Sequence, residues 1–196
     1  MITTEQIKAL RDQTGVSIML CRKALEEAKG DIEKAKVILQ RKGADAAAKK
    51  ADRTLGAGTV AAYIHGGGTV GVLVELSSET DFVSSNESFK DLAHDIAMHI
   101  AASRPEFVKR DDISAETLSR AKEVLEKEVE GKPQGMKEHI LEGKLQSYFA
   151  EKILLEQPFI KNPDVTVQNL IESAIQKFGE KIEITRFVRF ASGNRA

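Results

Sequence analysis

Two aspartates and two histidines in one short segment have types and spacing that could bind a metal ion. They are Asp91, His94, Asp95 and His99. Residues four apart lie on the same face of a helix, so Asp95 and His99 could face the same ion. The segment has neither the His-Glu-x-x-His spacing nor the cysteine cluster that would favour a zinc site. The sequence therefore gives more support to a solvent-exposed helix face than to metal chemistry.

Nucleophilic catalysis has no matching set of residues either. His65 ends an expected strand and His139 lies in a charged helical segment, and neither has an obvious acid to orient its ring. The sequence contains no Gly-x-Ser-x-Gly elbow. The single cysteine, Cys21, lies beside Leu20 and Ala24 at a helical position, where we expect it to pack rather than to react. We therefore expect no enzyme active site, no metal and no cofactor.

The strongest candidate for binding lies where a strand-like segment is followed by a helix-like one. Residues 70–76 alternate in the period of two that is typical of a half-buried strand. Residues 87–102 carry apolar side chains on one helical face, and Asn86 is a candidate N-cap. The turn between them, residues 77–86, is polar, so we expect it at the surface.

Within this turn, the motif Thr80-Asp81-Phe82-Val83 combines a large aromatic side chain with an acid. A phenylalanine at the tip of a turn on a rigid scaffold is a candidate anchor for a pocket on a partner protein. The alternative is that Phe82 folds back into the core while Asp81 or Thr80 caps a helical turn. The spacing alone leaves both interpretations open.

Four blocks of the chain, which occur in the order and at the spacing of the family, resemble the bacterial elongation factor Ts family. The block at the turn is Ser78-Glu79-Thr80-Asp81-Phe82-Val83. The other blocks are Leu10-Arg11 with Thr14-Gly15-Val16, Met19 and Arg22-Lys23-Ala24-Leu25; then Leu154-Leu155-Glu156-Gln157-Pro158-Phe159; and finally Arg186-Phe187-Val188-Arg189-Phe190. Together they span nearly the whole chain. The N-terminal block departs from the family's pattern at Val16, Ile18 and Leu20, where alanine, methionine and an acidic residue are more common.

The resemblance implies a translation elongation factor that exchanges guanine nucleotides without covalent chemistry. Such a factor binds elongation factor Tu with GDP, dislocates Mg²⁺ and promotes GDP release so that GTP can bind. Phe82 would insert between helices of the nucleotide-binding domain of elongation factor Tu near its Mg²⁺ site, and Asp81 would help to displace the ion indirectly. Thr80 and Val83 would shape the turn. The alternative is a non-catalytic interaction module that uses the N-terminal helices.

The resemblance also implies a second contact, made by the N-terminal helices with the same domain of elongation factor Tu. The residues that match the family are Arg11, Thr14, Gly15, Met19 and Lys23. Helix-turn packing and capping would account for Gly15 and for part of Met19 without any partner. Only Arg11 and Lys23 have the character of surplus surface groups.

Residues 1–43 predict a domain of three short helices. The expected N-caps are Thr3 with Gln6, Ser17 and Asp31, and the expected helix stops are Gly15, Gly30 and Gly43. Helices this short must share one small core, because each would be unstable alone. The resemblance identifies this segment as a ubiquitin-associated-like domain. Residues 44–56 are rich in alanine and lysine, and we expect a helical linker there.

Residues 57–196 predict an α+β domain, in which helices cover one side of a three-stranded antiparallel sheet. The expected elements are strands 59–65 and 69–76 joined by Gly66-Gly67-Gly68, a helix over 87–102, a helical hairpin at about 115–155, a helix capped by Thr166, and a strand over 182–190. The last strand is expected to place Ile182, Ile184, Val188 and Phe190 on one face.

The overall composition limits the classes of partner. With 41% hydrophobic and 30% charged residues, the 196-residue chain has the composition of a soluble globular protein. A net charge of −1 gives no basic excess, so we expect no direct contact with nucleic acid. A single cysteine fits a reducing cytosol. With no signal peptide and no apolar run approaching a membrane span, we expect a cytoplasmic protein without a membrane partner.

The resemblance further implies self-association. The chain has one sheet-plus-helices unit, whereas the longer members of the family have two related ones. Short members pair two copies through their sheets. Such pairing would cover the free face and edges of a three-stranded sheet. The last strand contains no cysteine, so we expect a non-covalent homodimer that binds two copies of elongation factor Tu.

Overall fold

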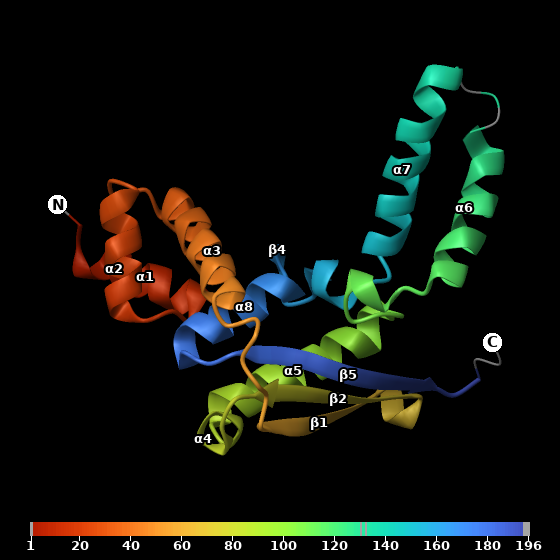
Figure 1. Ribbon diagram of the computed structural model, residues 1–196. Coiled ribbons are helices and arrows are strands. Elements are labelled where there is room, and N and C mark those ends of the chain that lie inside the picture. The colour runs from red at the N-terminus through yellow and green to blue at the C-terminus, as the bar shows by residue number, and fades with distance from the viewer. Residues whose placement is uncertain (1, 130, 132, 194–196) are drawn as a thin grey trace.

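Three helices open the chain and pack around one small core (Figure 1). The computed structural model describes residues 2–129, 131 and 133–193. The first helices are α1 (Thr4–Thr14), α2 (Ile18–Glu27) and α3 (Ile32–Ala48). Thr3, Ser17 and Asp31 each accept a backbone N–H from the residue three positions later, as expected for N-caps. The prediction of three helices here is confirmed.

Helix α3 does not end at Gly43, as the sequence suggested, but continues to Ala48. Gly43 lies against α8 (Val167–Phe178), and a methyl group in its place would meet Gln176 Nε2 at 2.5 Å and Glu172 Cβ at 3.1 Å. The glycine therefore permits close packing of two helices rather than ending one. The expected linker over residues 44–56 is accordingly helical only as far as Ala48. The domain boundary at residue 43 stays a prediction.

Alanine in place of glycine should have opposite effects at two helix-interior positions. Alanine favours a helix over glycine by about 1 kcal/mol. At Gly143, in α7 (Gln134–Ala150), nothing lies within 4 Å of the added methyl group, so Gly143→Ala should raise the free energy of unfolding by roughly 0.5–1 kcal/mol. Gly43→Ala should lower it by about 1 kcal/mol, because the methyl group separates α3 from α8. Urea unfolding measures both values; equal stabilisation of the two variants would contradict the close packing at Gly43.

The central sheet has three antiparallel strands in the order β1–β2–β5 (Figure 1). The strands are β1 (Ala57–His65), β2 (Val70–Ser78) and β5 (Ile182–Ala191). Gly66, Gly67 and Gly68 join the first two strands, with φ angles of 60°, 67° and 97°. Residues other than glycine rarely adopt such angles, so the glycines make the tight reversal possible. The predicted hairpin and three-stranded sheet are confirmed.

The four apolar residues of β5 do not share one face, contrary to the prediction from the sequence. They are Ile182, Ile184, Val188 and Phe190. The first two are buried, whereas the last two are 41% and 71% exposed. Thr185 is the cause, since the register with β2 skips this residue. The extra residue is a β-bulge, which turns the side chains after it to the opposite face of the sheet.

Two helices cover one face of the sheet, as predicted. Helix α5 (Glu87–Ser103) begins after its expected cap Asn86 and packs on β1 and β2. Helix α8 begins after Thr166, whose hydroxyl accepts the Asn169 N–H at 3.2 Å. Buried side chains of β2, β5, α5 and α8 form the main core, which is separate from the core of the N-terminal helices. The fold class is therefore α+β.

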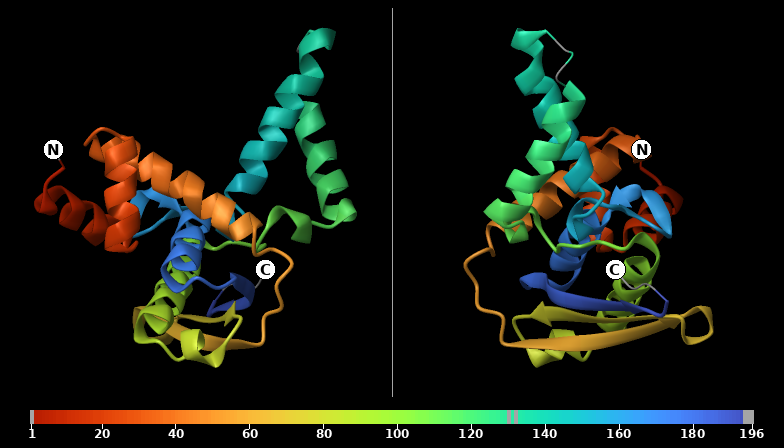
Figure 2. Two further views of the ribbon diagram at one scale, coloured as in Figure 1. Left: turned by 60° about the vertical axis from the view of Figure 1, so that its left-hand side comes forward. Right: turned by 90° about the vertical axis from the view of Figure 1, so that its right-hand side faces the viewer.

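A helical hairpin projects from the body of the molecule (Figures 1 and 2). Helices α6 (Ala115–Val129) and α7 pack against each other, which confirms the predicted hairpin. Helix α7 ends at Ala150, earlier than expected. Within the described residues, no helix combines the length and the apolar character needed to cross a membrane.

The short elements before and after this hairpin were not predicted from the sequence. They are the 3₁₀ turns η2 (Arg110–Asp112) and η3 (Leu154–Glu156), and the strands β3 (Pro158–Phe159) and β4 (Asn162–Thr166). The two strands pair as a small antiparallel hairpin outside the main sheet. The 3₁₀ turn η1 (Gly66–Gly68) lies instead in the reversal between β1 and β2.

Candidate partner-binding site

The motif Thr80-Asp81-Phe82-Val83 forms one turn of helix at the end of the sheet where β1 begins. Helix α4 (Asp81–Ser84) follows β2 almost directly, and Figure 1 shows it at one extremity of the molecule. The side chain of Phe82 is 82% exposed, the largest fraction among the large hydrophobic side chains that the structure describes. The alternative in which Phe82 folds into the core is therefore excluded.

The backbone under Phe82 is held from several directions. Val83 is 3% exposed and belongs to the main core. The Ser78 hydroxyl donates to the Thr80 carbonyl at 2.9 Å, and the Ser84 hydroxyl donates to the Asp81 carbonyl at 3.2 Å. Phe82 is therefore an apolar side chain presented to solvent by a rigid support.

The two residues before Phe82 have different surroundings. Thr80 occupies the N-cap position with extended backbone (φ −127°, ψ 157°), but its hydroxyl donates to the Glu180 carboxylate at 2.6 Å instead of capping α4. Asp81 is exposed and lines a shallow hollow together with Phe82, Ser85 and Asn86. The acid and the aromatic ring are thus presented side by side on the same surface.

The N-terminal residues singled out from the sequence surround the turn between α1 and α2. Arg11, Met19 and Lys23 are exposed, and Gly15 ends α1 with φ 68°. Thr14 is half-buried, and its hydroxyl donates to a main-chain carbonyl of α1 at 2.7 Å. Thr14 and Gly15 therefore build the turn, whereas the other three side chains face the solvent.

Sequence reasoning missed Ile18 on this surface and assigned part of Met19 to the core. Ile18 is 54% exposed and Met19 is 64% exposed. Helix α2 instead buries Cys21, Ala24 and Leu25. The spacing of these three residues defines a single buried face, and that spacing could have placed Ile18 and Met19 outside it.

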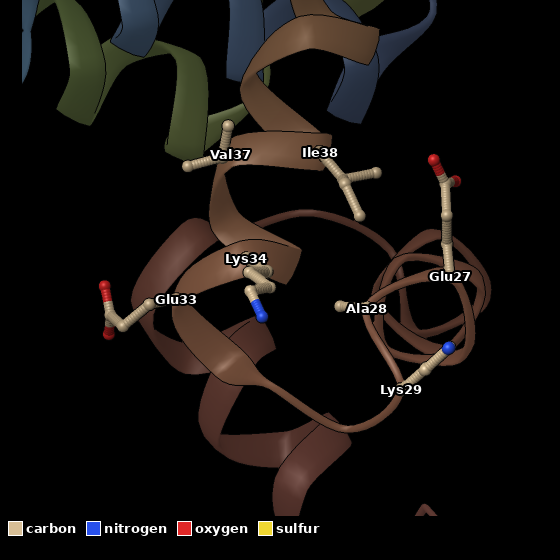
Figure 3. A pocket seen from close by; sticks show the side chains of 7 residues that line it. All are labelled: Glu27, Ala28, Lys29, Glu33, Lys34, Val37 and Ile38. Carbon is tan, nitrogen blue, oxygen red and sulfur yellow. The ribbon is translucent and has the colours of Figure 1, made fainter.

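An open groove lies between the end of α2 and the first half of α3 (Figure 3). Ala28, Val37 and Ile38 give it apolar walls. Its charged lining residues are Glu27, Lys29, Glu33 and Lys34. Figure 3 shows Glu33 pointing away from Ala28, on the other side of α3. The lining has two acids and two bases, and no residue predicted to contact the partner is among them, so the groove is not part of the candidate site.

The expectation of a solvent-exposed polar face on α5 is wrong at His99, which is fully buried. The β3–β4 hairpin covers the ring: Nε2 lies 2.9 Å from Gln157 Oε1, and the Ile160 N–H donates to Nδ1 at 3.3 Å. Asp95 pairs instead with Lys161 at 2.6 Å. Among residues 2–129, 131 and 133–193, no three His, Cys, Asp or Glu side chains gather as a metal site would require.

The burial of His99 should make stability depend on pH. Burial lowers the pKa of His99 below its ordinary value of 6.5, and the hydrogen bond with Gln157 opposes the shift. The unfolded chain therefore binds this proton at a higher pH than the folded protein does. The free energy of unfolding should fall as the pH drops below about 6.5.

Denaturant unfolding between about pH 5.5 and 7.5 measures this dependence. His99→Gln removes the titrating group and should flatten the curve. The matched control is His139→Gln, which changes an exposed histidine of α7 and should leave the pH dependence intact. An identical pH slope in the wild type and His99→Gln would contradict the assignment.

The uncovered face of the sheet carries apolar side chains from all three strands. They are Val60, Ile64, Leu73, Val188 and Phe190, each between 41% and 71% exposed. The strand register places Leu73 beside Val188. It also places Gly71 between Ile64 and Phe190. We call this surface the outer sheet face; it also carries the ion pair between Glu75 and Arg186, next to Val60. The bulge at Thr185 is what brings Val188 and Phe190 onto it.

Comparison with known proteins assigns the chain to a family. Residues 39–194 match the family model described as Elongation factor TS. The chain is 53% identical to elongation factor Ts of Carboxydothermus hydrogenoformans, over 98% of this chain and 90% of that protein. The elongation factor Ts proteins of Acetivibrio thermocellus and Moorella thermoacetica are 52% and 51% identical over 98% of this chain, and the matches cover 91% and 96% of those proteins. The resemblance seen in four sequence blocks therefore extends over nearly the whole chain, which belongs to the elongation factor Ts family of translation elongation factors.

Proposed function

We propose that this protein is a guanine-nucleotide exchange factor, which binds elongation factor Tu with GDP and promotes GDP release. The observation that carries the proposal is Phe82, a large apolar side chain 82% exposed on a rigid turn. Transfer of such a side chain from water into a pocket on a partner lowers the free energy of the system, and the side chain loses little conformational entropy on binding. Membership of the elongation factor Ts family supports the same role.

Exchange of this kind redistributes binding free energy and needs no covalent step. A GTPase that binds GDP with nanomolar affinity holds it by about 12 kcal/mol. Much of this comes from Mg²⁺ and from backbone N–H groups around the phosphates. An exchange factor must bind the open, metal-free state more tightly than the closed state. By linkage, the incoming GTP weakens the binding of the factor as much as the factor weakens the binding of nucleotide.

The residues of the motif Thr80-Asp81-Phe82-Val83, which we call the tip, would have different roles. Phe82 would enter between two helices of the nucleotide-binding domain near the Mg²⁺ site and hold them apart as a rigid wedge. Asp81, exposed beside it, would help to dislocate the ion by moving the helix that orders its water ligands. Thr80 and Val83 would hold the turn, since one bonds to Glu180 and the other is anchored in the core.

The N-terminal helices would make the second contact with the same domain of elongation factor Tu. Arg11, Met19 and Lys23 are available for it because they are exposed around the α1–α2 turn. Thr14 and Gly15 would fix the shape of that turn. In this proposal the N-terminal helices form a ubiquitin-associated-like domain, and the protein acts in the cytoplasm without direct contact with nucleic acid or membrane.

Release of fluorescently labelled GDP from elongation factor Tu, followed by stopped flow, tests the proposal. We expect the protein to accelerate release strongly at micromolar concentration. The main alternative is a non-catalytic module that binds a partner through the N-terminal helices. Formation of a complex without acceleration would favour that module. Loss of acceleration in His94→Ala, which alters a residue away from the tip, would instead point to an unrecognised site on α5.

The outer sheet face supports a homodimer formed through the core sheets. Five apolar side chains exposed on one face would be covered if two sheets packed face to face, and both partners would contribute the same residues around a two-fold axis. The tip and the α1–α2 turn lie outside this face. The dimer could therefore bind two copies of elongation factor Tu.

A further inference from the structure

Two glutamates form a crossed pair of hydrogen bonds directly beneath the Phe82 tip. Glu79, just after β2, accepts the backbone N–H of Lys181 at 2.5 Å. Glu180, just before β5, accepts the backbone N–H of Thr80 at 3.0 Å and the Thr80 hydroxyl at 2.6 Å. We call Glu79 and Glu180 the crossed clamp. Each carboxylate thus bonds the backbone of the segment that carries the other.

The crossed clamp extends the pairing of β2 and β5 beyond the ends of the strands. Their last register pair is Ser78 with Ile182, so the next two positions pair residue 79 with 181 and residue 80 with 180. At both positions a side-chain carboxylate accepts the N–H of the opposite segment. Hydrogen bonds from N–H groups to ionised carboxylates are stronger than those between neutral groups. The end of the sheet is therefore fixed where α4 begins.

The crossed clamp also holds the chain that leads from the N-terminal helices. Arg53 donates from Nη1 to both oxygens of Glu79 at 3.1 and 3.3 Å. Lys181 Nζ donates to the carbonyls of Ala51 and Arg53 at 2.7 and 3.2 Å. The hydrogen bond from the Lys181 N–H, and to a smaller extent the Arg53 guanidinium, hold the pKa of Glu79 below its ordinary value. The tip and the connector from α3 thus meet at one set of charged groups.

We infer that Glu180 is a positioning residue for nucleotide exchange, which fixes the start of α4 so that Phe82 is presented in one orientation. This inference rests on the proposed function of Phe82. A helix of four residues has almost no stability of its own, because its few internal hydrogen bonds do not offset the entropy of ordering it. Val83 anchors the turn on the core side, and Glu180 anchors its first residue from the other side. The aromatic ring between these two anchors is pre-organised for insertion, and pre-organisation reduces the cost of binding.

The first experiment examines the tip without any partner. The chain contains no tryptophan, so Phe82→Trp places a single indole at the tip. Time-resolved fluorescence anisotropy then reports how freely this indole moves on the nanosecond scale. Glu180→Ala in this background should lose most of the slowly decaying component. Glu180→Gln should retain it, because its amide oxygen still accepts the Thr80 N–H. The control is Glu87→Ala, which removes a carboxylate of α5 that pairs with Lys90 and should change nothing.

The second experiment measures GDP release with Phe82 in place. Glu180→Ala should slow the accelerated release about tenfold, and Glu180→Gln should recover most of the rate. Thr80→Val removes the hydroxyl that donates to Glu180, so its effect should be much smaller in the Glu180→Ala background than in the wild type. Thermal unfolding of each variant shows whether the fold is intact.

The outcomes separate the inference from the proposed function. Unchanged anisotropy in Glu180→Ala, or additive effects of Thr80→Val and Glu180→Ala on release, would overturn the positioning role while Phe82 could still be the wedge. Normal release in Phe82→Ala would overturn the wedge itself. A mobile indole in Glu180→Ala together with slower release, both recovered in Glu180→Gln, would establish the inference.

Discussion

Phe82→Ala should reduce the acceleration of GDP release at least 30-fold and leave the fold unchanged. Removing an aromatic side chain that fills a partner's pocket costs about 2 kcal/mol or more, which corresponds to roughly a 30-fold change. The ring is 82% exposed in the free protein, so its loss removes almost no packing. The free energy of unfolding should therefore change by less than about 0.5 kcal/mol.

Stopped-flow release of labelled GDP and thermal unfolding of the same preparation measure both effects. The matched control is Val124→Ala, because Val124 is a 62% exposed apolar residue on α6, in the projecting hairpin. This variant should release GDP at the wild-type rate. A marked loss of thermal stability in Phe82→Ala would indicate that the ring packs within its own chain. A wild-type rate in Phe82→Ala would require another origin for exchange.

Two glutamates introduced on the outer sheet face should convert the proposed homodimer to a monomer. Leu73 and Phe190 are 48% and 71% exposed on this face. In a face-to-face dimer, Leu73→Glu with Phe190→Glu would place four like charges in an apolar interface, at a cost of several kcal/mol. The dissociation constant should rise by a factor of at least about 1,000. Light scattering and analytical ultracentrifugation at micromolar concentration measure the change.

A control for this variant carries the same added charge elsewhere. Val124→Glu with Met136→Glu alters two exposed residues, 62% and 59%, on the helical hairpin. It should remain a dimer. A wild-type protein that is monomeric at micromolar concentration and fully active would rule out the dimer, and the outer sheet face would then need another occupant.

Local features of the fold could be predicted because their causes lie within a few residues along the chain. Thr3, Ser17 and Asp31 cap the helices that follow them, since each side chain bonds a backbone N–H three residues away. Three consecutive glycines permit positive φ and produce the β1–β2 reversal. The alternation in residues 70–76 correctly indicated which side of β2 is buried.

Features that depend on distant residues could not be predicted in this way. The local sequence predicts that a helix ends at Gly43, but the helix continues because this glycine packs against α8, more than a hundred residues later in the chain. The local sequence likewise predicts an exposed His99, but the β3–β4 hairpin covers this side chain. The bulge at Thr185 depends on the register with β2, and it reverses the face on which Val188 and Phe190 lie. Hydrophobic periodicity records a side chain's neighbours in sequence, but burial depends on neighbours in space.

The candidate site shows the same division. The sequence contains the motif Thr80-Asp81-Phe82-Val83, predicts its place between a strand and a helix, and carries the resemblance from which its role is proposed. It left open whether Phe82 is buried or exposed, because a single aromatic residue in a polar turn satisfies either pattern. The three-dimensional fold shows that Phe82 is exposed, since Val83 packs in the core while Glu180, from the far end of the chain, holds Thr80 in place. A side chain points outward when contacts distant in sequence fix the backbone that carries it, and no local pattern contains those contacts.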